Sequence, residues 1–262
     1  MEFENKTLLV TGGTSGIGLG VAQRMSELGV RVGIIARNSD KGQDVVSRLP
    51  VVSFGDHLFV SADASDPYSF QQGIEQIQNS LGSLDFIFHS IGMDCPGTVE
   101  ELGVLTWDKV IHTNLRSAYV LLHTVLPKML ERGQGIIIFN SSNKGLVAHI
   151  DDPIYCVSKA GLNMLMQSTA LRVANRGVRI NAVCPGPVRT STLLDEAQSA
   201  SHVPMNRVAE ISEIVGLVLF LFSDSASYIT GAAIPVDGGK SAGHDVGNMW
   251  INSIEPHDME EP

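Results

Sequence analysis

The sequence contains little of what secreted, metal-binding or nucleic-acid-binding proteins need. Its three cysteines, Cys95, Cys156 and Cys184, form no CxxC pair, which favours buried thiols in a reducing compartment over disulfides or a redox site. The eight histidines show no HExxH or related ligand spacing, so we expect no metal. Only 18 Lys and Arg stand against 28 Asp and Glu. Without clusters of basic residues, this balance argues against a nucleic-acid partner.

Long apolar runs are absent as well. The longest, such as Ile214 to Phe222, are too short to cross a bilayer, and Met1 to Glu4 do not resemble a signal peptide. We therefore expect no membrane partner and a cytoplasmic location. Hydrophobic residues make up 44% and charged residues 18% of the 262 positions, which is typical of a globular chain with one large α/β domain or two small ones.

Short β-branched runs alternate with longer helix-like stretches along the chain. Asp66-Pro67 and Asp152-Pro153 each suit an N-cap followed by the first helical position. Strands that alternate with helices indicate right-handed βαβ crossovers and a parallel sheet covered on both faces. The sequence predicts one α/β domain over residues 1–239, a Rossmann-type doubly wound parallel sheet of about seven strands. The expected strands are 7–10, 31–36, 57–60, 84–88, 135–140, 178–183 and 233–236, and the expected helices are about 16–28, 40–49, 67–80, 107–131, 153–176 and 210–222.

The last segment, residues 240–262, differs from the rest. It contains five Asp and Glu residues against the single Lys240, and it lacks apolar periodicity. This acidic tail is either a flexible end or an arm that needs a partner to become ordered.

The stretch TGGTSGIGLG, residues 11–20, stands where the first strand should pass into the first helix. Its spacing is not GxGxxG, and an ordinary strand-to-helix turn is the alternative. Glycines nevertheless allow close backbone approach, and a helix N-terminus offers N–H groups to a pyrophosphate. Polar or flexible residues follow all of the first six expected strands, and the carboxyl ends of parallel strands form the ligand-binding edge of such a sheet. The combination favours dinucleotide binding.

The end of the second strand bears on the choice of cofactor. An Asp or Glu about 20 residues beyond the glycine loop would bind a ribose 2′-hydroxyl. This chain has Ala36 and then Arg37 there, and a guanidinium can bind a 2′-phosphate in bidentate fashion. NADP(H) is therefore favoured over NAD(H), although a solvent-facing arginine at a strand end would give the same pattern. Asn38 can add a neutral hydrogen bond.

Tyr155 and Lys159 stand at i and i+4 of an expected helix and so share one helix face. A nearby cation lowers a tyrosine pKa from its usual ~10, which suits a general acid that protonates a carbonyl oxygen. Such pairs are also common on exposed helices. Ser142, at the end of the fifth strand, can donate to the same oxygen. Asn114, in the long helix after strand four, is a further candidate that a structural role would explain equally well.

Together these residues resemble the short-chain dehydrogenase/reductase family, in its compact single-domain branch. The resemblance extends from about Lys6 to Gly239. The motifs that carry it are TGGTSGIG at 11–18, Asn114, Ser142, YCVSK at 155–159, PGPVRT at 185–190 and VDGG at 236–239.

The resemblance implies a role for each catalytic candidate. Tyr155 would donate or accept the proton, and Lys159 would hold the nicotinamide ribose and depress the Tyr155 pKa. Ser142, thirteen residues before Tyr155, would polarise the substrate oxygen, and Asn114 would anchor a water that links Lys159 to solvent. The expected cofactor-binding residues are Gly12, Thr14, Ser15, Gly16, Ile17, Gly18, Arg37, Asn38, Asp63, Ala64, His89, Ile91, Gly92, Tyr155, Lys159, Pro185, Gly186, Val188 and Thr190.

One departure from the family pattern follows the fourth strand. The chain has His89-Ser90-Ile91-Gly92 where the family usually has Asn-Asn-Ala-Gly. Gly92 keeps the close approach to the cofactor, whereas Ile91 is bulkier than Ala beside the ribose. We expect His89 to replace amide hydrogen bonds structurally rather than to shuttle protons.

These expectations define an NADP(H)-dependent oxidoreductase that interconverts a ketone and a secondary alcohol. The expected substrate-site walls, 93–97, 144–152 and 187–205, mix apolar residues with His149, Asp152 and His202. They suit a small or medium ketone with some polarity, and a 3-oxoacyl thioester is the alternative substrate.

Other function classes fit the sequence less well. A non-catalytic dinucleotide-binding sensor would not need Tyr, Lys and Ser in register, and a dehydratase or epimerase of the extended branch would need a longer C-terminal domain. The family resemblance also implies a homotetramer built partly from helices 107–131 and 153–176, with a homodimer as the alternative.

Overall fold

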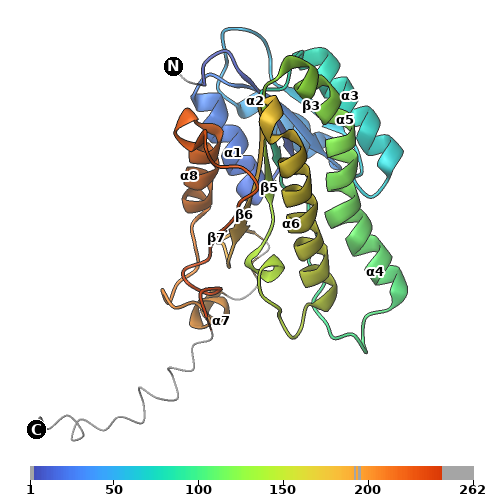
Figure 1. The fold of residues 1–262 in the computed structure, drawn as a ribbon, viewed down its shortest axis with the longest axis vertical. Helices are drawn as coiled ribbons and strands as arrows, with labels where there is room; N and C mark the ends of the chain where they lie inside the picture. The colour runs from blue at the N-terminus through green and yellow to red at the C-terminus, as the bar shows by residue number, and fades with distance from the viewer. Residues whose placement is uncertain (1–2, 192, 194–195, 244–262) are drawn as a thin grey trace, which may run out of the picture.

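Seven parallel strands form the centre of the computed structural model, which describes residues 3–191, 193 and 196–243 (Figure 1). Their order across the sheet is β3-β2-β1-β4-β5-β6-β7. The strands are β1 (Thr7–Thr11), β2 (Arg31–Ala36), β3 (Leu58–Ser61), β4 (Phe86–His89), β5 (Gly135–Asn140), β6 (Val178–Pro185) and β7 (Ala233–Val236).

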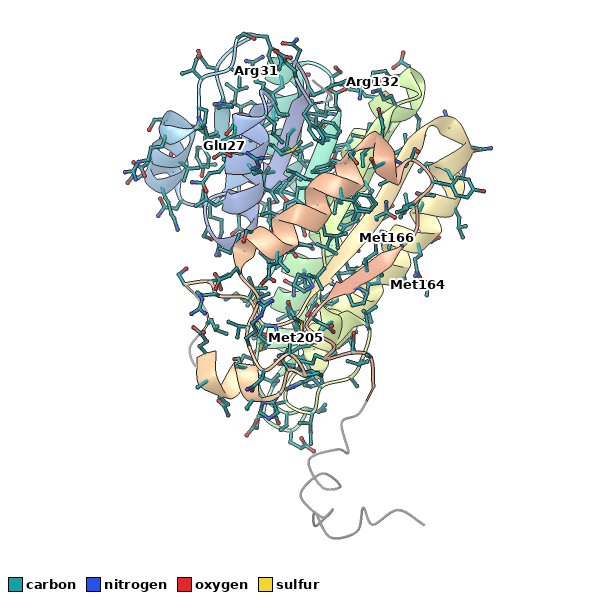
Figure 2. The ribbon with its side chains drawn as sticks, turned by 90° about the vertical axis from the view of Figure 1, so that its left-hand side faces the viewer. Glu27, Arg31, Arg132, Met164, Met166 and Met205 are labelled. Atoms are coloured by element: carbon teal, nitrogen blue, oxygen red, sulfur yellow. The ribbon has the colours of Figure 1, made fainter. Side chains whose placement is uncertain are left out.

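Helices cover both faces of this sheet (Figure 1). One apolar core lies between the sheet and α3, α5 and α6, and a second lies between the sheet and α1, α2 and α8. On α6, Met166 is buried against the sheet, whereas Met164 lies on the outer side and is 64% exposed (Figure 2). The α-helices are α1 (Gly16–Glu27), α2 (Ser39–Arg48), α3 (Pro67–Leu81), α4 (Val104–Ile111), α5 (Ser117–Arg132), α6 (Pro153–Val173), α7 (Glu196–Ser201) and α8 (Ile211–Phe222).

The strand order reverses between β1 and β4, which are neighbours in the sheet. Leu9 of β1 pairs with Gly33 of β2 on one side and with Ile87 of β4 on the other. The connections leave a crevice at this point, outside the carboxyl ends of the strands, and open α/β sheets bind their ligands there. The doubly wound α/β fold predicted from the sequence is therefore confirmed.

The expected strands agree with the observed ones to within two residues at either end. The expected helix 107–131 is instead three consecutive elements: α4, a π-helical turn at His112–Arg116, and α5. The short helix α7 was not predicted, because its six residues contain no buried apolar side chain and therefore no periodic pattern.

The two Asp-Pro pairs start helices as expected, but only one aspartate caps its helix. Asp66 accepts hydrogen bonds from the N–H groups of Tyr68 and Ser69 at 3.0 and 3.3 Å. Asp152 occupies the same position before α6, yet its carboxylate makes no cap hydrogen bond within the described residues. It binds Lys144 instead.

The predicted acidic tail lies mostly outside the described residues, which end at Gly243. Its first residue, Lys240, donates its N–H to the Asp237 carbonyl at 3.2 Å. Across residues 3–191, 193 and 196–243, every helix is too short or too polar to cross a membrane.

Candidate active site

The glycine loop between β1 and α1 is packed so closely that side chains would not fit. Gly12 has a φ of +76°, and a Cβ there would lie 2.8 Å from the Ser90 carbonyl oxygen. A Cβ on Gly18 would lie 2.3 Å from the Gly12 oxygen. Ser15 stands at the N-cap of α1, and its side chain makes no cap hydrogen bond within the described residues. The first N–H groups of α1 therefore lack a side-chain cap, which suits a phosphate.

The neighbouring strand ends offer further polar groups. Asn140, the last residue of β5, donates from Nδ2 to Ser90 Oγ at 3.0 Å. Its Oδ1 is buried and has no hydrogen-bond partner among the described residues, and a buried polar atom of this kind normally has a partner. The uncapped helix start, the glycine packing and this orphaned oxygen all fit a bound dinucleotide.

The loop after β6 approaches the same place. A Cβ on Gly16 would lie 3.5 Å from Thr190 Cγ2, so the predicted segments 12–18 and 185–190 face each other. Gly186 is equally constrained, since a Cβ there would lie 2.9 Å from the Asp237 Cα. The Gly186 N–H donates to the Val236 carbonyl at 3.0 Å, and Val188 forms a parallel bridge with Ala209.

At the end of β2, Arg37 is exposed, and its carbonyl accepts from Ser61 Oγ at 3.0 Å. Asn38 is also exposed, but its Oδ1 accepts from Lys41 N at 2.8 Å and caps α2. The hydrogen bond to the cofactor that the sequence suggested for Asn38 would therefore come from Nδ2, because the amide oxygen caps α2.

Asp63 and Ala64 follow β3, next to this strand end. Ala64 is buried, whereas the exposed Asp63 carboxylate accepts from Ser65 N and Oγ at 2.9 and 2.8 Å. These hydrogen bonds, helped by the Arg37 charge, hold the Asp63 pKa below its usual range. Asp63 is thus ionised at neutral pH and offers a hydroxyl-binding carboxylate near the arginine.

Ser142, Tyr155 and Lys159 meet beyond the end of β5, as the sequence predicted. The Lys159 ammonium lies 5.6 Å from the centroid of the Tyr155 ring and donates to the Asn140 carbonyl at 2.9 Å. The Ser142 hydroxyl is close enough to the phenol to lower its pKa by hydrogen bonding.

The direction of the Tyr155 pKa shift differs from the expected one. Burial raises the Tyr155 pKa above its ordinary value, and the charge of Asp94 raises it further. Burial also lowers the pKa of Lys159 to about 8, and the hydrogen bond from Ser142 offsets only part of the rise at the phenol. Tyr155 is therefore protonated at neutral pH and ready to donate.

Asn114 lies in the π-helical turn and is fully buried. Its Oδ1 accepts from Met93 N at 2.8 Å, and its Nδ2 donates to Met93 O at 3.0 Å and to Ser158 Oγ at 3.1 Å. The amide thus pins the segment after Gly92, where a Cβ would lie 3.3 Å from Lys159 Nζ. This is a structural role, and the predicted water link to solvent stays a prediction.

His89 ends β4 with its ring fully buried. Nδ1 lies 2.8 Å from Thr11 Oγ1, and Nε2 lies 3.2 Å from Ser117 Oγ. Because Ser117 Oγ donates to the Thr113 carbonyl, it accepts from Nε2–H, and Nδ1 accepts from Thr11. Burial, with the charge of Lys159, lowers the His89 pKa to about 3. The ring is neutral and enclosed, so a contribution to cofactor binding would run through the backbone of the loop containing Ile91.

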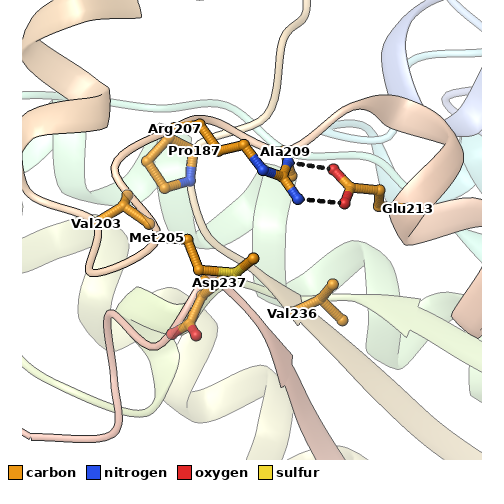
Figure 3. A pocket seen from close by; sticks show the side chains of 9 residues that line it. Pro187, Val203, Met205, Arg207, Ala209, Glu213, Val236 and Asp237 are labelled. Atoms are coloured by element: carbon orange, nitrogen blue, oxygen red, sulfur yellow. Dashed lines mark hydrogen bonds and ion pairs between the residues drawn. The ribbon is translucent and has the colours of Figure 1, made fainter.

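A cavity of about 110 Å³ lies beside the loop after β6 (Figure 3). Arg207 reaches across its edge in a paired contact with Glu213, with both N–O distances 2.7 Å. The expected wall 187–205 contributes part of the lining, whereas Ser142, Tyr155 and Lys159 do not. The lining residues are Pro187, Val203, Met205, Arg207, Ala209, Glu213, Val236, Asp237 and Gly238.

The sequence analysis missed one group at this site and gave a second, within the expected wall 144–152, no role of its own. The Asn140 carbonyl that holds Lys159 carries no side-chain signal. Lys144, whose Nζ lies 5.8 Å from the Tyr155 ring centroid, stands two residues after Ser142, and that spacing is the one feature that could have drawn attention to it.

Cysteine and metal chemistry receive no support from the geometry. Cys95, Cys156 and Cys184 are all free thiols. Among residues 3–191, 193 and 196–243, no three His, Cys, Asp or Glu side chains are placed to hold a metal ion. The reducing, cytoplasmic location expected from the sequence stays a prediction.

The relatives of this chain are oxidoreductases that act on CH–OH donors, and the chain is one of this class. Residues 12–241 match the family model described as enoyl-(acyl carrier protein) reductase. The chain belongs to the short-chain dehydrogenase/reductase family.

Characterised relatives cover nearly the whole chain. It is 32% identical to the 2,5-dichloro-2,5-cyclohexadiene-1,4-diol dehydrogenase LinX of Sphingobium indicum, over 92% of this chain and 98% of that one. It is 33% identical to the 3-oxoacyl-[acyl-carrier-protein] reductase FabG of Staphylococcus aureus, over 89% and 97%. A solved short-chain dehydrogenase/reductase family protein superposes with a TM-score of 0.84 at 33% identity, over 93% of this chain and 100% of that one.

Substituting His89 should change how stability depends on pH. Below pH ~6.5 the unfolded chain takes up a proton on His89 that the folded chain does not accept until about pH 3. The contribution of His89 to the free energy of unfolding is complete above pH ~6.5. It is lost as the pH falls, by ~1.4 kcal/mol per pH unit. The free energy of unfolding, measured in urea between pH 7 and pH 4.5, should therefore fall less steeply with pH in His89→Asn than in the parent.

The exposed His202 provides the control. His202→Asn should keep the parent's slope. Parallel slopes for the parent and His89→Asn would mean that His89 is protonated in the folded protein.

Proposed function

We propose that this protein is an NADP(H)-dependent oxidoreductase that interconverts a ketone and a secondary alcohol. The observation that carries the proposal is the meeting of Ser142, Tyr155 and Lys159 at the sheet edge next to the glycine loop. Tyr155 is the general acid, and Ser142 donates a hydrogen bond to the same substrate oxygen. The cofactor, when bound, supplies or accepts the hydride.

Burial sets the protonation states that this chemistry needs. The raised pKa of Tyr155 keeps its proton in place until a negative charge develops on the substrate oxygen. Lys159, with its pKa lowered to about 8, lies within reach of the ribose and the phenol and is the nearest buried group that can restore the proton. Gly92 leaves room for a ribose beside the ammonium, because a Cβ there would lie 3.3 Å from Nζ.

The relatives support the reaction class and leave two substrate classes. LinX acts, by its name, on a cyclic diol, and FabG on a 3-oxoacyl thioester. Our preferred substrate is a small or medium polar ketone, and a 3-oxoacyl thioester is the second candidate. NADPH oxidation measured against a panel of ketones, β-diketones and 3-oxoacyl thioesters distinguishes them.

Tyr155→Phe keeps the ring packing and removes the proton donor. The kcat should fall at least ~100-fold, the usual scale of general acid catalysis, with NADPH affinity nearly unchanged because Lys159 remains. Steady-state kinetics and NADPH titration measure the two effects. Tyr228→Phe, at a fully exposed ring, is the matched control. A Tyr155→Phe enzyme that kept most of its kcat would exclude Tyr155 as the acid.

The preference for NADP(H) rests on Arg37. The side chain is exposed at the end of β2, where Ala36 introduces no like charge. A charge-assisted bidentate contact with a 2′-phosphate contributes ~1.5–3 kcal/mol, or roughly 10- to 150-fold in affinity. Asp63 opposes the effect, because its ionised carboxylate lies close enough to Arg37 to feel its charge.

Ala36→Asp combined with Arg37→Gln should shift the preference toward NAD(H) by roughly 10- to 150-fold. The change should appear in KM for NADP(H), because the contact involves a part of the cofactor that does not react. The measurement is kcat/KM with both cofactors. Arg48→Gln, on the exposed far end of α2, should leave the ratio unchanged. If the parent protein prefers NADH, Arg37 does not set a preference for NADP(H).

We further propose a homotetramer that uses the outer faces of α5 and α6. Most apolar residues of these helices lie in the core, so apolar content alone does not require a partner. Three exposed residues nevertheless repeat every seven positions along α6: Val157, Met164 and Leu171, with exposures of 48, 64 and 85%. On α5, which packs against α6, Tyr119 is 59% exposed and stacks on His123. An exposed apolar strip such as that of α6 suits an interface.

Met164→Glu with Leu171→Glu should dissociate the assembly, because it places charges within the strip. Light scattering should give four times the chain mass of 28.1 kDa for the parent and a smaller mass for the variant. Tyr68→Glu, at an exposed ring of α3, is the control. A parent that is monomeric at micromolar concentration would exclude the tetramer.

A further inference from the structure

The loop between Ser142 and α6 carries a charged cluster beside the candidate acid. Lys144 Nζ lies 5.8 Å from the Tyr155 ring centroid and binds the Asp152 carboxylate. His149 Nδ1 lies 3.8 Å from the same carboxylate oxygen, Oδ2. The reaction chemistry described above uses none of these three side chains.

Asp152 is turned away from the role that its position suggests. An aspartate at a helix N-cap ordinarily accepts from the first N–H groups of the helix, as Asp66 does before α3. The Asp152 carboxylate instead points into the loop, with only 4% of its side chain exposed. The local sequence therefore places a buried carboxylate near the Tyr155 phenol, where burial is unfavourable unless its hydrogen bonds are made.

Two buried atoms in the cluster have no hydrogen-bond partner among the described residues: Asp152 Oδ1 and His149 Nδ1. A carboxylate oxygen accepts hydrogen bonds, whereas a ring nitrogen of neutral histidine either accepts or donates. Burial and the charge of Lys144 lower the His149 pKa, which favours this neutral form. A hydroxyl group matches the pair, because it donates its one proton to the carboxylate and accepts from Nδ1–H of the ring.

Other ligand groups match the cluster less well. An anion would meet the buried Asp152 charge, and an apolar group would leave both polar atoms without partners at a loss of affinity. A water could join the same two atoms, and a substrate hydroxyl would replace it with equivalent hydrogen bonds.

We propose that Lys144, His149 and Asp152 form a subsite for a second oxygen of the substrate, a hydroxyl on a carbon near the reacting one. The substrate class is then a diol or hydroxyketone rather than a plain ketone or a long acyl thioester. Lys144 holds the Asp152 carboxylate in place, and Asp152 accepts a hydrogen bond from the substrate hydroxyl. His149 Nδ1 makes the second hydrogen bond to the same hydroxyl. The inference rests on the proposed function only in placing the reacting oxygen at Tyr155.

The kinetic test compares 2-hydroxycyclohexanone with cyclohexanone, which differ by one hydroxyl. In Asp152→Asn the amide oxygen is drawn to the Lys144 ammonium, so an NH2 group replaces the acceptor Oδ1. The ratio of kcat/KM, hydroxyketone over ketone, should fall at least ~10-fold, since a site built for a hydroxyl discriminates strongly. Asp151→Asn, at the exposed neighbouring carboxylate, should leave the ratio unchanged.

The result differs if the contact between Lys144 and Asp152 only stabilises the loop. Asp152→Asn would then affect both substrates equally, and the unchanged ratio would overturn the subsite. If Asp152→Asn fails to fold, Lys144→Met serves the same comparison, because it frees the carboxylate from its fixed position.

A binding measurement separates this inference from the proposed function. Cyclohexane-1,2-diol should shift the His149 ring resonances in NMR spectra, and cyclohexanol should bind at least ~10-fold more weakly. A His149→Gln variant assigns the signal. If no ketone is reduced yet the diol binds selectively, the proposed function fails and the subsite stands. Equal binding of diol and alcohol overturns the subsite, whatever the activity.

Discussion

The hydrogen bond from the Lys159 ammonium to the Asn140 carbonyl joins the end of β5 to the first turns of α6, and the rest of the site is arranged around it. Lys159 is 3% exposed, and a buried cation is stable only when its donors are satisfied. The Asn140 carbonyl accepts from the ammonium, and Gly92 lies beside Nζ. Tyr155, one helical turn earlier, is partly buried on the same helix, and burial is the largest cause of its raised pKa.

Sequence periodicity predicted the sheet and its helices well, because buried parallel strands and amphipathic helices leave strong patterns. Ser142, Tyr155 and Lys159 were also predictable, since each stands at a fixed distance from a strand end or helix start. The orientation of Asp152 was not. An Asp-Pro pair indicates a capped helix whether or not the carboxylate turns away, and the contact with Lys144 that decides this spans eight residues of irregular loop.

Protonation states were the least predictable part of the site. The sequence shows that Tyr155 has a cation nearby, but the outcome depends on how deeply both groups are buried and where the ammonium donates. His89 gives a second example. Its neutral state follows from burial and the charge of Lys159, and its tautomer follows from Thr11 on β1 and Ser117 at the start of α5. Only the folded chain brings these groups to the ring.

The π-helical turn at His112–Arg116 has a consequence for how this protein can vary. Each residue advances an α-helix by about 100°. The wider π-helical turn therefore changes the angle around the helix axis at which the side chains of α5 project, relative to those of α4. Removing one residue there would restore a regular helix and rotate Asn114 away from Met93, or else rotate the outer face that carries Tyr119. Substitutions in this turn that leave Asn114 in place are therefore tolerable where a change of length is not. Homologous chains that align through 112–116 without a gap should be those that kept the same amide contact.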